Sequence, residues 1–232
     1  MDKKILDEGK RFLVSYLKDK TVDYETYHPW RSNWEFVVLH SLRVEGYVKK
    51  ILSIENHNLS QNDILITQLA AILHDLGRIH RREGHALLGR DIISDWLKDN
   101  HIIPLGVNES SRLLYLIEKH SDKEDGYEDY CLKVLRDADV LDEIGAMSIF
   151  MASNWIDRNN PYYFNLLSDR LENLEISYCE KALKLLNTEG ARLILEEKKK
   201  FITCFVDQLK DELYGTEMFG QVSMENYFSD LL

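Results

Sequence analysis

Apolar side chains recur every three or four positions along most of the 232-residue chain, and no segment shows sustained alternation of apolar and polar residues. A period of three to four places the apolar side chains on one face of an α-helix, whereas a period of two would indicate a strand. The chain has only 11 Gly and 3 Pro, so few positions favour turns. The pattern therefore predicts an all-α fold without a sheet.

The same pattern predicts a bundle of about seven to eight helices or more. Asn33 and Ser60 are good N-terminal caps, and the apolar stripes that follow them predict helices over 33–54 and 60–77. Further helices are expected over 5–17, 84–99, 108–120 after Asn108, 127–152, 165–187 and 189–213. The last two would form a pair of long C-terminal helices.

A chain of 232 residues with 44% hydrophobic residues can bury one large core. We expect one domain over residues 1–232, with a core at about 30–150 and a helical extension at about 155–232. The clearest internal break runs from Asn154 to Pro161, but it is too short to indicate a domain boundary.

The formal net charge is −11, which argues against nucleic acid and against an anionic membrane surface as partners. An anionic substrate would need a local positive site. The N-terminal residues do not resemble a signal peptide, and no stretch of about 18 apolar residues occurs. Cys131, Cys179 and Cys204 are isolated, which indicates reduced thiols. We therefore expect a cytoplasmic location.

The pair His74-Asp75 ends an otherwise apolar helix and is the most informative feature of the sequence. A buried imidazole and carboxylate need hydrogen bonds, an ion pair or a metal, because burying them without partners costs several kcal/mol. Taken alone, the pair is equally compatible with a helix end that faces water.

Two further residues lie on inward stripes of other expected helices. His40 shares its stripe with Val37 and Val44, and Asp139 follows Leu135 by four residues, whereas Asp137 points another way. A lone inward histidine is usually a hydrogen-bonded core residue. Together, however, nitrogen and oxygen ligands from three helices can converge on one divalent cation, for which Mn, Fe, Co, Ni, Zn and Mg are all candidates.

Four protein ligands on a six-coordinate ion would leave positions for a water and a phosphate oxygen. The ion would lower the pKa of that water and neutralise charge on the phosphoryl group. The constellation thus predicts hydrolysis of a phosphate ester or anhydride by a metal-bound hydroxide.

His40 in His-Ser-Leu-Arg-Val, then His74-Asp75 and then Asp139, resembles the ordered signature of the HD superfamily of metal-dependent phosphohydrolases. The resemblance covers about residues 35–145, and the tail from Tyr178 to Glu212 is similar to small bacterial HD hydrolases that end in two long helices. It implies an all-α HD domain and metal ligation by these four residues. Asp139 is preferred over Asp137 because it matches the family's Ala-Asp-x-Leu pattern.

Some HD proteins bind a second metal through histidines between the His-Asp pair and the last Asp, and His85 and His120 occupy those places. Asp75 would then bridge the two ions. Both histidines also suit hydrogen-bonded positions in the core or at helix ends, and the sequence leaves the two interpretations open. The other histidines are expected to face solvent: His28, His57, His80 and His101.

Arg43, one turn from His40, and Arg78, directly after the metal pair, are the expected contacts to substrate phosphate. Arg81 and Arg82 fit a solvated turn better. Asp142 lies one turn after Asp139 and is expected to orient a water or a ligand, with simple solvent exposure as the alternative.

Alarmone-hydrolysing relatives carry a Glu-Asp pair shortly after the His-Asp motif, whereas this chain has Leu76-Gly77-Arg78-Ile79. The departure weakens an alarmone assignment and leaves no obvious carboxylate as general base.

The resemblance favours a nucleotide substrate, with a nucleoside triphosphate pyrophosphohydrolase as the first candidate. The alternatives are a di-iron HD-type oxygenase, which would use the two extra histidines, and a nucleotide-sensing HD module without turnover. The expected partner is a small phosphorylated molecule. The sequence leaves the oligomeric state open, a homodimer included.

Overall fold

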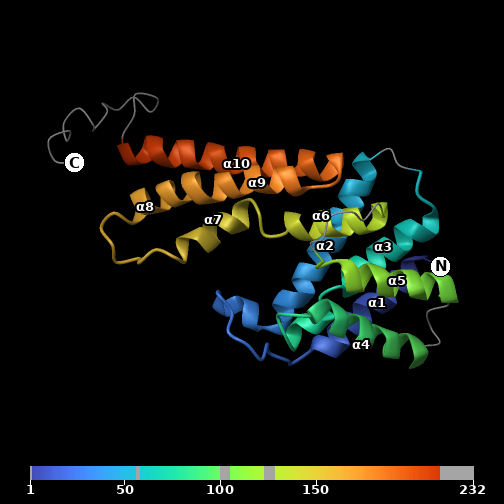
Figure 1. The fold of residues 1–232 in the computed structure, drawn as a ribbon. Coiled ribbons are helices and arrows are strands. Elements are labelled where there is room, and N and C mark those ends of the chain that lie inside the picture. The colour runs from blue at the N-terminus through green and yellow to red at the C-terminus, as the bar shows by residue number, and fades with distance from the viewer. Residues whose placement is uncertain (1, 56–57, 100–104, 123–128, 215–232) are drawn as a thin grey trace. The chain divides into compact units, whose positions relative to one another are not determined.

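A computed structural model describes residues 2–55, 58–99, 105–122 and 129–214. These residues fold into helices joined by turns, and Thr21 and Asn33 form an isolated β-bridge rather than part of a sheet (Figure 1). The expected all-α fold is thereby confirmed. Within the described ranges no helix is both long enough and apolar enough to cross a membrane.

The backbone divides into two compact units. Among the described residues, the first comprises those up to Asp142 together with Asn187–Ala191, and the second comprises Glu143–Leu186 and those from Arg192 to Tyr214. The organisation of 1–232 as one domain, with an extension from about residue 155, stays a prediction.

The first unit is built around α3. Its helices are α1 (Asp2–Leu17), α2 (Trp34–Ile54), α3 (Gln61–Leu73), α4 (His85–Asp99), α5 (Val107–Lys119) and α6 (Tyr130–Leu141). Helix α3 packs against α1, α2, α5 and α6, and every residue from Leu69 to Leu73 is buried. A helix that is apolar on all sides belongs in the centre of a bundle, which explains why its C-terminal end lies deep in the unit.

The helix starts follow the expected caps closely. Helix α2 begins directly after Asn33, and at the start of α3 the Ser60 hydroxyl accepts a hydrogen bond from the Asp63 backbone N–H at 3.0 Å. Helix α5 begins at Val107 after Gly106, one residue before the expected cap at Asn108. Of these three starts, only that of α3 is capped by a side chain, because Asn33 makes no capping hydrogen bond and Gly106 has no side chain to make one.

Helix α3 ends at Leu73, four residues before Gly77, where the sequence predicts its end. A short 3₁₀ turn (Leu76–Ile79) follows and packs against the start of α4. A Cβ atom on Gly77 would lie 2.1 Å from the backbone oxygen of His85, so only glycine permits this approach. The turn thereby brings Asp75 next to the first residue of α4.

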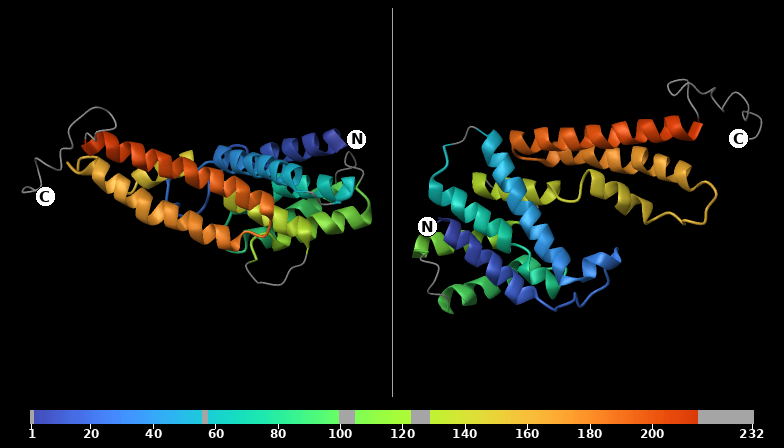
Figure 2. Two further views of the ribbon diagram at one scale, coloured as in Figure 1. Left: turned by 90° about the horizontal axis from the view of Figure 1, so that it is seen from above. Right: turned by 180° about the vertical axis from the view of Figure 1, so that it is seen from behind.

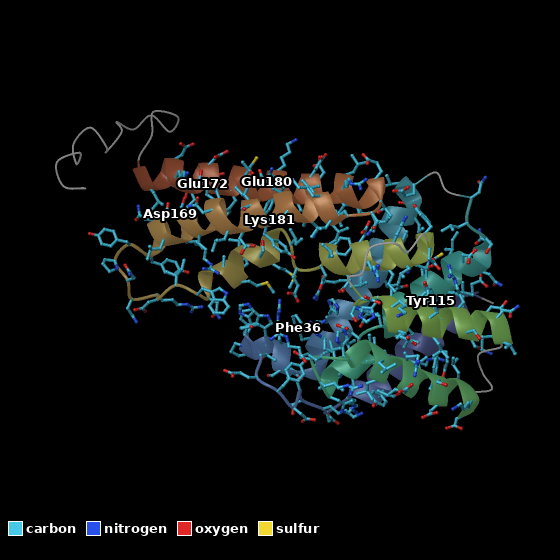
Figure 3. The ribbon with its side chains drawn as sticks, viewed as in Figure 1. Phe36, Tyr115, Asp169, Glu172, Glu180 and Lys181 are labelled. Carbon is cyan, nitrogen blue, oxygen red and sulfur yellow. The ribbon has the colours of Figure 1, made fainter. Side chains whose placement is uncertain are left out.

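The second unit contains α7 (Ala146–Ser153), α8 (Tyr163–Arg170), a π-helical segment (Leu171–Ile176), α9 (Ser177–Leu185) and most of α10 (Glu189–Tyr214). Helix α8, the π-helical segment and α9 are continuous and run beside α10 in both views of Figure 2. Lys199 lies 2.8 Å from Glu180, and Lys210 lies 2.7 Å from Glu172, so the two long elements are antiparallel (Figure 3). The two expected C-terminal helices are confirmed.

The single helix expected over 127–152 is wrong. Residues 127–128 lie outside the described residues, and the remainder forms α6 and α7 with a turn between them. Glu143 and Gly145 have φ angles of 64° and 101°, in the left-handed region that a right-handed helix cannot contain. Asp142 is the C-cap of α6 and so begins this turn.

Candidate metal centre

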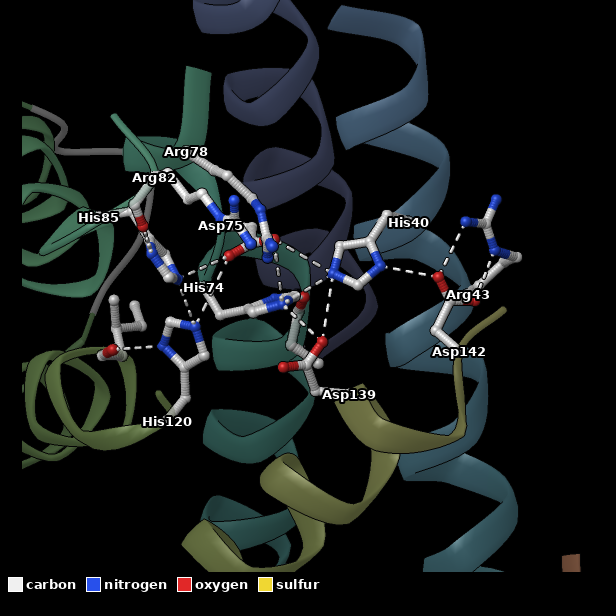
Figure 4. Close-up of polar contacts among 12 residues, drawn as sticks. His40, Arg43, His74, Asp75, Arg78, Arg82, His85, His120, Asp139 and Asp142 are labelled. Atoms are coloured by element: carbon white, nitrogen blue, oxygen red, sulfur yellow. Dashed lines mark hydrogen bonds and ion pairs between the residues drawn. The ribbon is translucent and has the colours of Figure 1, made fainter. Parts of the chain in front are cut away.

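Six histidine and aspartate side chains from the first unit meet at the C-terminal end of α3 (Figure 4). They come from α2, from the C-cap of α3 and the residue after it, from the start of α4, from the C-cap of α5 and from α6: His40, His74, Asp75, His85, His120 and Asp139. The imidazoles of His74 and His120 and the carboxylate of Asp75 are at most 1% exposed. All six residues that the sequence predicts as metal ligands are therefore neighbours in space.

Four of these side chains surround one point. The Nε2 atom of His40 lies 3.2 Å from His74 Nε2, 3.2 Å from Asp75 Oδ2 and 3.3 Å from Asp139 Oδ1. His74 Nε2 lies 3.9 Å and 3.7 Å from the same two oxygens. Ligands about 2.1 Å from a cation have neighbouring atoms about 3.0–3.4 Å apart, so this group is close to the spacing of a metal site.

The other oxygen of Asp75 faces a second group. Asp75 Oδ1 lies 3.2 Å from His85 Nε2 and 3.6 Å from His120 Nε2, and these two nitrogens are 3.3 Å apart. The Asp75 carboxylate thus has one oxygen in each group. This is the geometry of a carboxylate that could bridge two cations.

The opposite ring nitrogen of every histidine in the cluster donates a hydrogen bond. In His74, His85 and His120, Nδ1 donates to the carbonyl oxygen three residues earlier, at 2.7 to 2.8 Å. In His40, Nδ1 donates to Asp142 Oδ2 at 2.7 Å. A neutral imidazole with its proton on Nδ1 carries a lone pair on Nε2, the form that binds a metal.

The cluster is therefore poorly satisfied by protein atoms alone. The Nε2 atoms of two histidine pairs face each other, and Asp75 Oδ1 is buried without a hydrogen-bond partner among the described residues. Buried groups in this state are costly unless a proton or a cation lies between them. The residues present fit one divalent cation well, and the unpartnered oxygen together with two further imidazoles fits a second.

The charges of the cluster also favour a cation. Burial tends to raise the pKa of Asp75, but Arg78, His74, His120 and His40 together hold it well below its usual range. Burial lowers the pKa of His40, yet hydrogen bonds with Asp139, Asp142 and Asp75 outweigh burial and raise it well above its usual value. The carboxylates of Asp75, Asp139 and Asp142 thus favour a proton on His40 Nε2 while no cation is bound, and a bound cation would replace that proton.

Asp142 lies outside the cluster and holds His40 in place. It is buried and accepts hydrogen bonds from His40 Nδ1 and, at 2.6 and 2.8 Å, from Nε and Nη2 of Arg43. Burial raises its pKa, but the contacts with His40 and Arg43 outweigh burial and lower the pKa to about 2. The alternative of a solvent-exposed Asp142 is wrong. Arg43 binds this carboxylate, and its contact with substrate phosphate stays a prediction.

Arg78 lies directly beside the cluster, where its Nη1 donates to Asp75 Oδ2 at 2.9 Å. Its side chain is 40% exposed, so the guanidinium is accessible from solvent. Interaction with Asp75 raises the pKa of Arg78, which keeps the guanidinium charged. The permanent positive charge of Arg78 beside the cluster supplies a local field that attracts anions, although the chain as a whole is acidic.

Asp137 does not join the cluster, in agreement with the preference for Asp139. Its buried carboxylate accepts hydrogen bonds from the backbone and side chains of Asn187 and Thr188, which precede α10. Thr188 in turn accepts a hydrogen bond from Ala191 at the start of that helix. Sequence analysis missed this structural function because the partners are about fifty residues away.

The expectation of solvent-facing histidines is half wrong among the described residues. His80 is exposed, but His28 is only 5% exposed and stacks on Trp30 with ring centroids 4.6 Å apart. His57 and His101 lie outside the described residues. An isolated histidine in a loop shows no periodic pattern, so its burial could not be read from the sequence.

The sequence of residues 37–147 matches the HD domain family. This segment contains all six clustered residues and ends just beyond Asp142. Residues 37–147 therefore carry an HD domain, the domain of HD-type metal-dependent phosphohydrolases.

Among known proteins, the chain is similar to the uncharacterized protein YpgQ of Bacillus subtilis, with 26% identity over 163 residues that cover 67% of this chain and 76% of YpgQ. The crystal structure of B. subtilis YpgQ in complex with ADP shares the fold, with a TM-score of 0.59, 21% identity and coverage of 91% of this chain and 96% of that chain. A predicted HD superfamily hydrolase from an uncultured Thermotogales bacterium has a TM-score of 0.60 and 21% identity, with coverage of 90% and 92%.

Proposed function

We propose that this HD-type enzyme hydrolyses a nucleotide, with release of pyrophosphate from a nucleoside triphosphate as the first candidate reaction. The observation that carries the proposal is the convergence of four histidine Nε2 atoms on the two oxygens of Asp75. The complex of B. subtilis YpgQ with ADP supports a nucleotide, because that protein shares the fold.

His40, His74, Asp75 and Asp139 would hold one divalent cation, and His85 and His120 with Asp75 would hold a second. A bound cation supplies an acidified water and neutralises charge on a phosphoryl oxygen. The protein's own contribution is to orient these ligands. Asp142 keeps the proton of His40 on Nδ1, and three backbone carbonyls do the same for the other imidazoles.

Arg78 would bind a phosphoryl oxygen beside Asp75. A guanidinium presents several N–H donors in a rigid plane and matches phosphate oxygens well. Its contact with Asp75 fixes the side chain before substrate arrives, so less conformational entropy is lost on binding. Arg43 would contribute from the opposite side, next to His40.

The test is a screen of nucleoside mono-, di- and triphosphates and dinucleotides with several divalent metals. Phosphate and pyrophosphate are measured separately, which identifies the bond that breaks. We expect turnover with at least one metal and pyrophosphate from a triphosphate. Absence of turnover with every metal, together with tight nucleotide binding, would instead indicate a sensing module.

Asp75→Ala tests the site itself. The variant should lose both bound metal and activity while its helical circular dichroism remains that of the parent. Asp95→Ala is the matched control, because the Asp95 side chain is 73% exposed on α4 and forms an ion pair with Lys98, away from the cluster. Activity retained by Asp75→Ala would contradict the assignment of the site.

The two-group geometry also supports a second candidate, a di-iron oxygenase. Histidines on both sides of a bridging carboxylate suit two iron ions as well as other divalent metals. Elemental analysis of protein purified under low-oxygen conditions distinguishes the candidates. Two irons per chain with oxygen consumption and no phosphate release would favour the oxygenase.

A further inference from the structure

Two arginines follow the His74-Asp75 pair, and each contacts the cluster in a different way. Arg78 donates directly to Oδ2. The backbone oxygen of Arg82 accepts the Nδ1 hydrogen bond of His85, whose Nε2 faces Oδ1. The position of each arginine is therefore coupled to one of the two groups of the cluster.

The Arg82 guanidinium has different partners from the guanidiniums of Arg43 and Arg78, which both bind carboxylates. It lies over the ring of Tyr27, 5.0 Å from the ring centroid, and makes no hydrogen bond or ion pair with any residue in the described ranges. A cation–π contact engages the face of the guanidinium and leaves its N–H donors available for an acceptor. In Figure 4 its side chain lies beside that of Arg78, near Asp75.

The segment before α2 holds Tyr27 at this place. The hydroxyl of Tyr24 donates to the backbone oxygen of Arg78 at 2.9 Å, and the backbone oxygen of His28 accepts from the Thr26 hydroxyl at 2.9 Å. His28 itself is buried. Tyr27 thus lies between Tyr24 and His28, although Tyr27 itself is 61% exposed.

The charges around Tyr24 also indicate that Arg82 lies near Arg78 and Asp75. Burial raises the pKa of Tyr24, and the charges of Arg78, Asp75 and Arg82 also act on its hydroxyl. The two guanidiniums and the Asp75 carboxylate therefore lie within electrostatic reach of one phenol. In a chain with a net charge of −11, two such cations beside one carboxylate are a local exception.

We propose that Arg82 binds a second phosphate group of the substrate while Arg78 binds the phosphoryl group at the cluster, and that Tyr27 positions Arg82 for this contact. The site then prefers molecules with two or more linked phosphates over monophosphates. The identity of that substrate as a nucleotide rests on the proposed function; the binding of linked phosphates does not.

Isothermal titration of the full chain with inorganic pyrophosphate and with orthophosphate, in a magnesium buffer, tests the proposal. Arg82→Ala should weaken pyrophosphate binding about ten-fold, the effect of one charge-assisted contact, and leave orthophosphate binding within about two-fold. Arg81→Ala is the matched control, because it removes the same charge from a side chain that folds against Gly84. Equal loss in both variants, or no loss in Arg82→Ala, overturns the proposal.

Tyr27 is tested by a pair of variants. Tyr27→Phe keeps the ring and should keep pyrophosphate affinity, whereas Tyr27→Ala should lose part of the affinity that depends on Arg82. If a triphosphate substrate is found, Arg82→Ala should raise its KM about ten-fold with a much smaller change in kcat. A loss confined to kcat would contradict a binding function for Arg82.

The outcomes separate the two proposals. Pyrophosphate binding that depends on Arg82, without turnover of any nucleotide, would leave the inference standing and reject the hydrolase. Nucleotide turnover by the parent, with unchanged pyrophosphate affinity in Arg82→Ala, would support the hydrolase and reject the inference about Arg82.

Discussion

Asp137 and Asp139 lie two residues apart on α6 but have opposite surroundings. Asp137 is buried among N–H and O–H donors of Asn187 and Thr188, at 2.7 to 3.0 Å, and so fixes the start of α10. Asp139 instead faces the Nε2 atoms of His40 and His74, whose protons lie on Nδ1. A carboxylate surrounded by protein donors stabilises the fold, whereas one that faces lone pairs is suited to a cation.

The largest expected effect follows from removing the carboxylate in the cluster. Asp139→Ala should reduce phosphohydrolase activity about a thousand-fold, because one ligand and its negative charge are lost from the metal site. Urea unfolding should show a free energy of unfolding within about 1 kcal/mol of the parent when both are metal-free. An active Asp139→Ala variant with full metal content would remove Asp139 from the site.

The corresponding substitution at Asp137, Asp137→Ala, should reduce stability and leave metal binding intact. It leaves buried donors of Asn187 and Thr188 without an acceptor, so we expect a loss of about 3 kcal/mol in the free energy of unfolding. Metal content per folded chain should stay at the parent level. Loss of metal at unchanged stability would reverse the comparison and make Asp137 the ligand.

A smaller effect on metal affinity is expected at Asp142, which contacts the cluster through His40. Asp142→Ala removes the acceptor of His40 Nδ1, and the loss of such a partner typically weakens metal binding about 10- to 100-fold. Competition with a chromophoric chelator measures the affinity. Asp142→Asn, which keeps one acceptor oxygen, should recover part of the loss; equal affinities in parent and Asp142→Ala would contradict this function.

The smallest change concerns the second group. His120→Ala should lower the metal content from about two ions per chain to about one, because the first group keeps its four ligands. Elemental analysis of dialysed protein gives the ratio. Lys119→Ala, a neighbouring position on α5 outside the cluster, serves as the control. A parent protein with one ion, unchanged in His120→Ala, would limit the centre to a single metal.

Much of the helical fold and the membership of the cluster followed from the sequence. Helical periodicity and caps such as Ser60 are local, and three of the four cluster imidazoles donate to a carbonyl only three residues away. The hydrogen bonds of His74 and His120 reach back into the last turns of α3 and α5, so they form with those helices. His85 instead bonds to Arg82 in the turn before α4. The inward stripe of α2 likewise placed His40.

Contacts between distant residues were decided only by the tertiary structure. The pairing of His40 with Asp142 spans 102 residues, and the pairing of Asp137 with Thr188 spans 51. The break between α6 and α7 depends on left-handed residues at Glu143 and Gly145, and the burial of His28 depends on its stacking with Trp30. The sequence alone indicated which residues come together in the cluster, through the inward stripes of the helices, which are local, and through the resemblance to the HD signature. Which polar partner each buried group finds depends on how the helices pack, and only the folded chain decides that.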